Sequence, residues 1–209
     1  MAHAKTGPPP APGPPPSPRR QARQAELLEA ALRVIRRGHG RVAMEDIAAE
    51  AGISRPILYR HFGDATGLYA AVADHFCQEL LGRLRLSRAD RLPGRVLLRR
   101  QISAYLGFIA EEPDVYRFLV HQSPPDRPRA ATHGSGFSRM IADSTARHLR
   151  EAGWDPATAL AGADLFVGGL EAAASRWVEE PTGTPEDLAD RLTGVLWNGF
   201  ETGGAMRRP

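Results

Sequence analysis

The chain has 209 residues, of which 42% are hydrophobic, so it is long enough to build its own core without disulfide bonds. Its net charge of +3 is unevenly spread: residues 1–62 carry ten Lys and Arg against five Asp and Glu, and residues 63–209 carry seventeen against nineteen. A basic N-terminal part indicates contact with nucleic-acid phosphates. Every basic residue except Lys5 is arginine, so a coding bias is an alternative explanation.

The only cysteine, Cys77, lies in an apolar helical context, which favours a packed thiol over a nucleophile or a metal ligand. We therefore expect a reducing, cytoplasmic location. Residues 1–18 contain eight prolines, which predicts a disordered tail with no signal peptide. An inert tail is favoured over an arm that follows the minor groove, because Lys5 is its only charge.

Apolar residues at helical spacing predict a first helix from Arg19 to Arg37, ended by Gly38-His39-Gly40, where His39 is expected to be a solvated loop residue. Two short helices follow between Met44 and Phe62. Gly52 supplies the backbone freedom for a sharp exit after Ala51. Ser54 is a favourable N-cap residue and Pro56 suits a first turn, so the second helix should start at Arg55.

The second short helix has two distinct faces. Leu58 and Phe62 are four residues apart and share a buried stripe, whereas Pro56, Tyr59 and Arg60 point away. The helix start at Ser54 is a natural phosphate seat, and Arg55 can make a bidentate contact with guanine worth roughly 1–3 kcal/mol. Tyr59 and His61 suit phosphate or thymine-methyl contacts. The predicted DNA-binding residues are Arg41, Ser54, Arg55, Pro56, Tyr59, Arg60 and His61.

The segments Ile47-Ala48, Ala51-Gly52-Ile53-Ser54, Leu58-Tyr59-Arg60-His61-Phe62 and Leu68-Tyr69, preceded by Ala30-Ala31 and Gly38-His39-Gly40, resemble the DNA-binding domain of the TetR family of bacterial regulators. Members of that family usually place Thr or Ser, and Lys, on phosphates at two positions that here hold Ala43 and Ala65. Arg41 or the pair Arg19-Arg20 are the expected substitutes.

Further helices are predicted from Leu68 to about Leu86, from Val96 to Glu111, from Pro113, from Phe137 to Ala152, from Asp155-Pro156 to Glu180, and from Thr184-Pro185 to Gly203-Gly204. No segment alternates like a strand and no run reaches the ~18 apolar residues of a membrane span. The expected fold is all-α, with a Pro-rich tail (1–18), a helix-turn-helix DNA-binding domain (19–66) and a helical effector-binding and dimerisation domain (67–209).

Reading a duplex normally uses two copies of a helix-turn-helix, so a homodimer is expected. The final two predicted helices carry more apolar residues than one core stripe needs, and the resemblance implies that they pair as a four-helix bundle. The predicted interface consists of Leu160, Phe166, Val167, Leu170, Trp177, Leu192, Leu196 and Phe200. The resemblance also implies an effector pocket, predicted at Tyr105, Phe108, Tyr116, Phe118, His121 and Trp154.

We therefore expect a ligand-responsive transcriptional regulator, a repressor released from a palindromic operator by a small hydrophobic effector. No cofactor, metal or membrane partner is expected, nor is catalysis, because the acids lie mostly at helix ends and the histidines lack metal-ligand spacing. Two alternatives stay open. One is an enzyme of the recombinase or transposase type that uses the helix-turn-helix for targeting; the other is a helical protein-interaction module without an effector.

Overall fold

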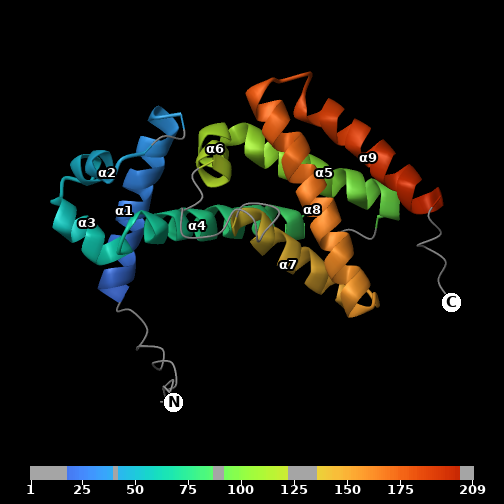
Figure 1. Ribbon diagram of the computed structural model, residues 1–209, viewed down its shortest axis with the longest axis horizontal. Helices are drawn as coiled ribbons and strands as arrows, with labels where there is room; N and C mark the ends of the chain where they lie inside the picture. Colours follow the sequence, from blue (N-terminus) through green and yellow to red (C-terminus); the bar gives the residue numbers. More distant parts are fainter. Residues whose placement is uncertain (1–17, 40–41, 87–91, 122–135, 203–209) are drawn as a thin grey trace, which may run out of the picture.

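The computed structural model describes residues 18–39, 42–86, 92–121 and 136–202, and within these ranges the chain forms nine helices and no strand (Figure 1). The all-α prediction is confirmed. The predicted tail at residues 1–17 and Arg41 lie outside the described residues. Helix α1 starts at Pro18, the last residue assigned to that tail.

The N-terminal end of the molecule consists of α1 (Pro18–Arg37), α2 (Met44–Glu50) and α3 (Arg55–Phe62), and we call it the head. The apolar stripe of α1 buries Leu27, Ala31 and Ile35 against the two short helices. Helix α2 ends where Gly52 takes a positive φ of 62°, as the sequence predicts for a sharp turn. The head is thus a three-helix unit that presents α3 at one end of the molecule (Figure 1).

Helix α4 (Ala65–Leu86) runs from the head into the rest of the chain, which we call the body (Figure 1). It buries Leu68, Val72, Phe76 and Leu80, and these residues belong to one apolar cluster that continues from the head into the body. Cys77 is 1% exposed within this cluster and burial raises its pKa to about 11, which agrees with a packed thiol. The predicted domain boundary after residue 66 falls in the first turn of α4.

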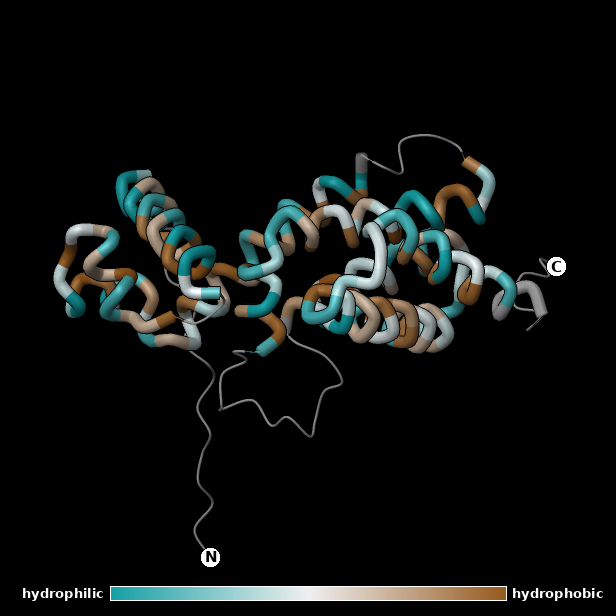
Figure 2. Tube along the Cα trace, turned by 90° about the horizontal axis from the view of Figure 1, so that it is seen from above, coloured by the Kyte–Doolittle hydropathy of each residue, from teal (hydrophilic) through white to brown (hydrophobic). Residues whose placement is uncertain are grey.

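The body contains α5 (Gly94–Glu111), α6 (Pro113–His121), α7 (Gly136–Glu151), α8 (Pro156–Glu179) and α9 (Pro185–Thr202). Helix α8 packs along α7, and α9 packs along α5. Hydrophobic and hydrophilic residues alternate along these helices (Figure 2), and the buried hydrophobic residues, among them Ile102, Ile141 and Val167, form one core cluster. The short α6 lies where the body meets the head (Figure 1).

Local sequence signals fix the starts of α8 and α9. The Asp155 carboxylate accepts hydrogen bonds from the backbone N–H groups of Ala157 and Thr158, at 3.0 and 3.2 Å. At α9, Thr184 and Asp187 form a reciprocal capping box: the Thr184 hydroxyl accepts from the Asp187 N–H at 3.1 Å, and the Asp187 carboxylate accepts from the Thr184 N–H at 2.9 Å. Both predicted helix starts are confirmed.

Helix α8 is the one helix in the described part of the chain that is long and apolar enough to cross a membrane, with a mean hydropathy of 1.2. Its buried residues include Ala163, Val167 and Ala174, which pack in the core of the body. Packing inside the chain thus accounts for part of the apolar character of α8, since 33% of this apolar stretch is buried while Leu165 is exposed.

Candidate nucleic-acid interface and interior cavity

Helix α3 presents one polar face to solvent and anchors the opposite face in the head. Leu58 and Phe62 are 0% and 6% exposed, whereas Pro56, Tyr59 and Arg60 are exposed. Tyr59 keeps 38% of its surface exposed although it is a large aromatic residue. The predicted division of α3 into a buried and an outward face is thus confirmed, and the outward face has the dimensions of a helix that enters a major groove.

The first turn of α3 has free hydrogen-bonding capacity. Ser54 has the extended backbone of an N-cap residue, but its side chain makes no capping hydrogen bond. Its hydroxyl is therefore available to a ligand. The Arg55 N–H is available too, because N–H groups in the first turn of a helix have no acceptor within the helix. Pro56, the next residue, has no N–H. This arrangement suits a phosphate oxygen at the positive end of the helix.

Arg55 is engaged in the free protein. Its guanidinium forms an ion pair with Glu45 of α2, and both side chains are about half exposed. Sequence reasoning did not anticipate this contact. Exposed ion pairs contribute up to about 1 kcal/mol, less than the roughly 1–3 kcal/mol of a bidentate contact with guanine, so the pair orients Arg55 without preventing DNA contact.

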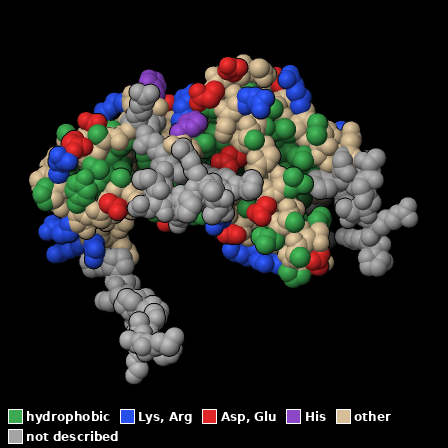
Figure 3. All heavy atoms as spheres, viewed as in Figure 1, with side chains coloured by type: hydrophobic (Ala, Val, Ile, Leu, Met, Phe, Trp, Pro, Cys, Tyr) green, Lys and Arg blue, Asp and Glu red, His purple; other side chains and the backbone are tan. Residues whose placement is uncertain are grey.

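His61 is less exposed than the other predicted DNA-binding residues of α3, because its ring is partly buried. Burial lowers the pKa of His61, and the nearby guanidinium groups of Arg60, Arg20 and Arg23 lower it further. The imidazole is therefore neutral at neutral pH. The same observation places Arg20 and Arg23 of α1 beside the end of α3, and Figure 3 shows basic side chains gathered there, at the lower left.

The positions Ala43 and Ala65 are both exposed at helix starts. Ala43 is the N-cap residue of α2 and makes no side-chain hydrogen bond. Arg20, one of the predicted substitutes for the missing phosphate contacts, lies near the end of α3, where its charge lowers the pKa of His61.

The joint between α3 and α4 is tightly packed. A Cβ atom on Gly67 would lie 1.7 Å from the carbonyl oxygen of Phe62, so only glycine fits there. The Gly67 N–H also donates to the Asp64 carboxylate at 2.8 Å, which caps α4. The end of α3 therefore contacts the start of α4 directly.

The body contains an interior cavity of about 550 Å³ between α4, α5, α7 and α8, with Trp197 of α9 at its edge. This volume lies within the roughly 300–1,000 Å³ typical of small-molecule sites. Most of the wall is apolar: Leu81, Leu84, Leu97, Leu98, Ile141, Leu149, Trp154, Phe166, Val167 and Leu170. The polar side chains of the wall are Arg85, Gln101, Tyr105, Ser144, Thr145 and His148.

Two of the six predicted pocket residues, Tyr105 and Trp154, line this cavity. The other four do not line it. Phe108 is buried against Phe76 with ring centroids 4.3 Å apart, and Phe118 is buried 5.9 Å from the Tyr69 ring. Tyr116 is buried against α8, and His121 is exposed on α6. An aromatic residue at helical spacing packs into the core more often than it lines a ligand site.

Comparison with known proteins supports this geometry. Residues 27–72 match the family described as bacterial regulatory proteins, tetR family, and residues 94–199 match the tetracyclin repressor-like C-terminal domain. An uncharacterized HTH-type transcriptional regulator of Mycobacterium tuberculosis is 32% identical over 193 residues, covering 89% of this chain and 82% of that protein. This chain belongs to the TetR family.

One further relative and one solved structure are also regulators of this type. The HTH-type transcriptional activator FasR of Mycolicibacterium smegmatis is 32% identical over 113 residues, which is 54% of this chain and 52% of FasR. The crystal structure of a TetR-like regulator from Rhodococcus sp. RHA1 superposes with a TM-score of 0.61 at 26% identity, covering 90% of this chain and 99% of that one. As a TetR-family protein, this chain is a helix-turn-helix transcriptional regulator.

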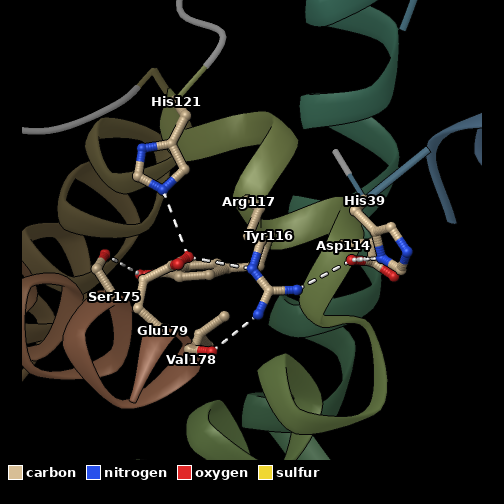
Figure 4. Close-up of polar contacts among 8 residues, drawn as sticks. All are labelled: His39, Asp114, Tyr116, Arg117, His121, Ser175, Val178 and Glu179. Carbon is tan, nitrogen blue, oxygen red and sulfur yellow. Dashed lines mark hydrogen bonds and ion pairs between the residues drawn. The ribbon is translucent and has the colours of Figure 1, made fainter. Parts of the chain in front are cut away.

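In this TetR-family chain, polar contacts of α6 connect α8 to the head (Figure 4). Arg117 donates to Glu179 at 3.1 Å and to the Val178 carbonyl at 2.8 Å, both on α8, and to Asp114 at 3.0 Å. Asp114 in turn lies 3.5 Å from His39, which is 84% exposed directly after α1. His121 also approaches Glu179, at 3.8 Å.

Three arginines at the end of α1 hold the TetR-type head together and join it to the body. Arg33 and Arg37 both pair with Glu50 of α2, and these hydrogen bonds lower the pKa of Glu50. Arg36 pairs with Glu112, at the junction of α5 and α6. In the free protein these three basic residues are therefore engaged in contacts within the chain.

The predicted dimer residues differ in how far they are exposed. Val167 and Leu170 are 2% and 5% exposed and belong to the protomer core, and Phe166, Trp177, Leu192 and Leu196 are partly buried against it. Leu160 is 48% exposed, and the side chain of Phe200 lies outside the described residues. Leu165 of α8 and Val195 of α9, which the prediction did not include, are both 72% exposed.

In the described part of the chain, no group of three or more His, Cys, Asp or Glu side chains could hold a metal ion. The acids reported above act as helix caps or pair with arginines.

Proposed function

We propose that this protein is a homodimeric repressor that binds a palindromic operator through Ser54, Arg55, Pro56, Tyr59, Arg60 and His61, and that a hydrophobic effector in the body cavity weakens this binding. The observation that carries the DNA half is the exposed face of α3 with its uncapped, basic start. The cavity of about 550 Å³ with its apolar wall supports the effector half.

The effector would act by population shift. Its binding favours the body conformation that fits it best, and operator affinity falls by the difference in effector affinity between the two conformations. Helix α4 supports this coupling, because Leu81, Leu84 and Arg85 near its end line the cavity while its start packs against α3 through Gly67. Repression is proposed because release from DNA by an effector is typical of the family. FasR is described as an activator, so transcription of the target gene with and without the protein distinguishes repression from activation.

The dimer is proposed to form through the exposed face of α8 together with α9. Leu165 is strongly exposed, and Gly168 and Gly169 on the same helix have open space where a Cβ would lie. Small residues next to an exposed leucine allow a second copy of α8 to approach closely. Changing Leu165→Glu should give a monomer in sedimentation experiments, whereas Val96→Glu, at another exposed apolar site, should stay dimeric; a dimeric Leu165→Glu protein would argue against this interface.

Operator binding is tested by fluorescence anisotropy with DNA from the region upstream of the gene. Affinity should fall steeply with salt, because phosphate contacts release counterions. Arg55→Ala should weaken binding by roughly 1–3 kcal/mol and relax specificity at one base pair. Arg139→Ala on α7 is the matched control and should bind like wild type. Equal operator affinity in Arg55→Ala and the control would remove Arg55 from the interface.

A further inference from the structure

We propose that the effector is an elongated lipophilic carboxylic acid, with its carboxylate bound by Arg85 at the mouth of the cavity and its chain extending along α5 toward Tyr105. This inference rests on the proposed function, in which a ligand in this cavity controls DNA binding. It adds the charge, the shape and the orientation of that ligand.

The shape follows from the residues of α5 that line the cavity. They extend from Gly94 at the start of the helix to Tyr105, and at a rise of about 1.5 Å per residue this length is about 16 Å. Gly94 is exposed, whereas Tyr105 is 2% exposed and Leu170, also in the wall, is 5% exposed. The cavity is thus long, open at the Gly94 end and closed at the Tyr105 end.

The charge of the wall selects against a cation. Among the described residues that line the cavity there is no Asp or Glu, while Arg85 of α4 contributes a positive charge. Arg85 is exposed, and no acidic side chain in the described ranges pairs with it. Arg83, two residues earlier, is by contrast paired with Glu111 and stacked over the Phe108 ring. Arg85 is therefore the cation available to a ligand at the mouth.

The start of α5 adds to the positive electrostatic potential that Arg85 creates at the mouth. Gly94, at the open end, is the first residue of an 18-residue helix, and its N-cap residue Pro93 provides no side-chain hydrogen bond. The free N–H groups and the positive helix end therefore lie beside the mouth that Arg85 also lines. An anionic head group gains from both, and an ammonium group is repelled by both.

Tyr105 fixes the orientation. Its hydroxyl makes no hydrogen bond of normal geometry to the described residues, and burial, together with the neighbouring Tyr116, raises its pKa well above the ordinary value, so the phenol stays neutral. A single neutral donor cannot compensate the desolvation of a buried carboxylate. The carboxylate therefore belongs at the exposed Arg85 end and the chain at the Tyr105 end.

The test uses three probes that share one chain: decanoate, decanol and decyltrimethylammonium. Their affinities are measured on the full-length protein by quenching of tryptophan fluorescence, since Trp154 and Trp197 both line the cavity. Decanoate should bind roughly tenfold more tightly than decanol, the gain expected of one charge-assisted contact, and decyltrimethylammonium should bind most weakly.

The variants assign this preference to Arg85. Arg85→Gln should remove the advantage of decanoate over decanol while leaving the affinity for decanol unchanged, and Arg85→Lys should retain part of it. Arg147→Gln removes an exposed arginine of α7 outside the cavity and should keep the full preference. Tyr105→Phe should also keep it, because the carboxylate does not reach that end.

Three results would overturn the inference: tightest binding of the ammonium probe, an unchanged preference in Arg85→Gln, or a preference lost in Tyr105→Phe. Operator affinity is measured in parallel by anisotropy without any probe. If none of the probes bound, the inference would fail together with the hydrophobic effector of the proposed function, whereas DNA binding would stand or fall on its own measurement.

Discussion

Arg36 of α1 and Glu112 at the junction of α5 and α6 form a two-pronged ion pair, with nitrogen–oxygen distances of 2.8 and 2.7 Å. The two residues are 76 positions apart, and the pair joins the head to the body. A second contact lies nearby, where the buried Tyr69 hydroxyl of α4 donates to the Leu119 carbonyl of α6 at 2.8 Å. The orientation of the head is therefore set by α6 and by the end of α5, the helix that lines the cavity.

Changing Glu112→Gln should weaken the coupling between effector and operator more than it weakens the fold. The pair is partly exposed, so its loss should cost at most about 1 kcal/mol of unfolding free energy. The ratio of operator affinities without and with decanoate should nevertheless shrink, because the two parts lose a fixed contact. Asp190→Asn is the control, since it breaks an exposed arginine pair with Arg99 that lies wholly in the body. Equal ratios in wild type and Glu112→Gln would exclude this route.

Changing Glu45→Gln should strengthen operator binding. The substitution frees Arg55 from its ion pair and removes a negative charge next to the proposed phosphate seat. The gain should be at most about 1 kcal/mol, the upper value of an exposed pair, and should diminish as salt rises. Asp190→Asn provides the comparison, because it releases Arg99 from an exposed pair in the body and should leave operator affinity unchanged. Weaker binding by Glu45→Gln would mean that the ion pair holds Arg55 in its DNA-binding position.

The head could be predicted from sequence because its signals are local. Gly52, Ser54 and Pro56 determine where two short helices end and begin, and the four-residue spacing of Leu58 and Phe62 determines which face is buried. The contact of Arg55 with Glu45 could not be predicted in this way. It depends on the angle between α2 and α3, which the packing of both helices on α1 decides.

The cavity could be predicted only in its general character. A stripe of aromatic residues predicts burial, but it does not separate a cavity wall from a filled core, and Phe108, Tyr116 and Phe118 belong to the core. The polar wall residues Arg85 and His148 come from α4 and α7, which are far apart in sequence and become neighbours only after folding. The same limit applies to the dimer prediction, since Val167 and Leu170 are buried at the cavity wall rather than exposed to solvent.

The stability of the protein should fall as the pH drops through the range in which His61 titrates. Because burial lowers the pKa of His61 in the folded state, the unfolded chain, with a pKa of about 6.5, takes up the proton first. The stability associated with neutral His61 is present above about pH 6.5 and is lost as the pH falls through the folded-state pKa. Carboxylates paired with arginine, such as Glu50, have lowered pKa values and therefore titrate at more acidic pH than His61.

This pH effect is measured by urea unfolding at about pH 7 and about pH 5.5, on either side of the relevant range. His61→Gln should lose less stability between the two conditions than wild type. His121→Gln, which removes an exposed imidazole on α6, should behave like wild type. Parallel losses in all three proteins would show that another group controls stability in this range.

Tyr105 and Tyr116 are neighbouring buried tyrosines whose hydroxyl groups have opposite status. The Tyr116 hydroxyl donates to the Glu171 carbonyl at 3.1 Å and lies 3.0 Å from the Ser175 hydroxyl, and burial raises its pKa to about 12. The Tyr105 hydroxyl makes no hydrogen bond of normal geometry to the described residues, although it lies close enough to the Tyr116 hydroxyl for each to affect the pKa of the other. Removing the hydroxyl oxygen should therefore lower the free energy of unfolding at Tyr116 but not at Tyr105.

Tyr116→Phe should lower the unfolding free energy by about 1–2 kcal/mol, because the Glu171 carbonyl loses its donor in a buried setting. Tyr105→Phe should leave stability unchanged or raise it by up to about 1 kcal/mol, since it removes a buried polar atom that nothing satisfies. Urea unfolding of both variants checks the contrast. A loss in Tyr105→Phe comparable to that in Tyr116→Phe would show that the Tyr105 hydroxyl is satisfied in solution, and would assign its partner to water inside the cavity.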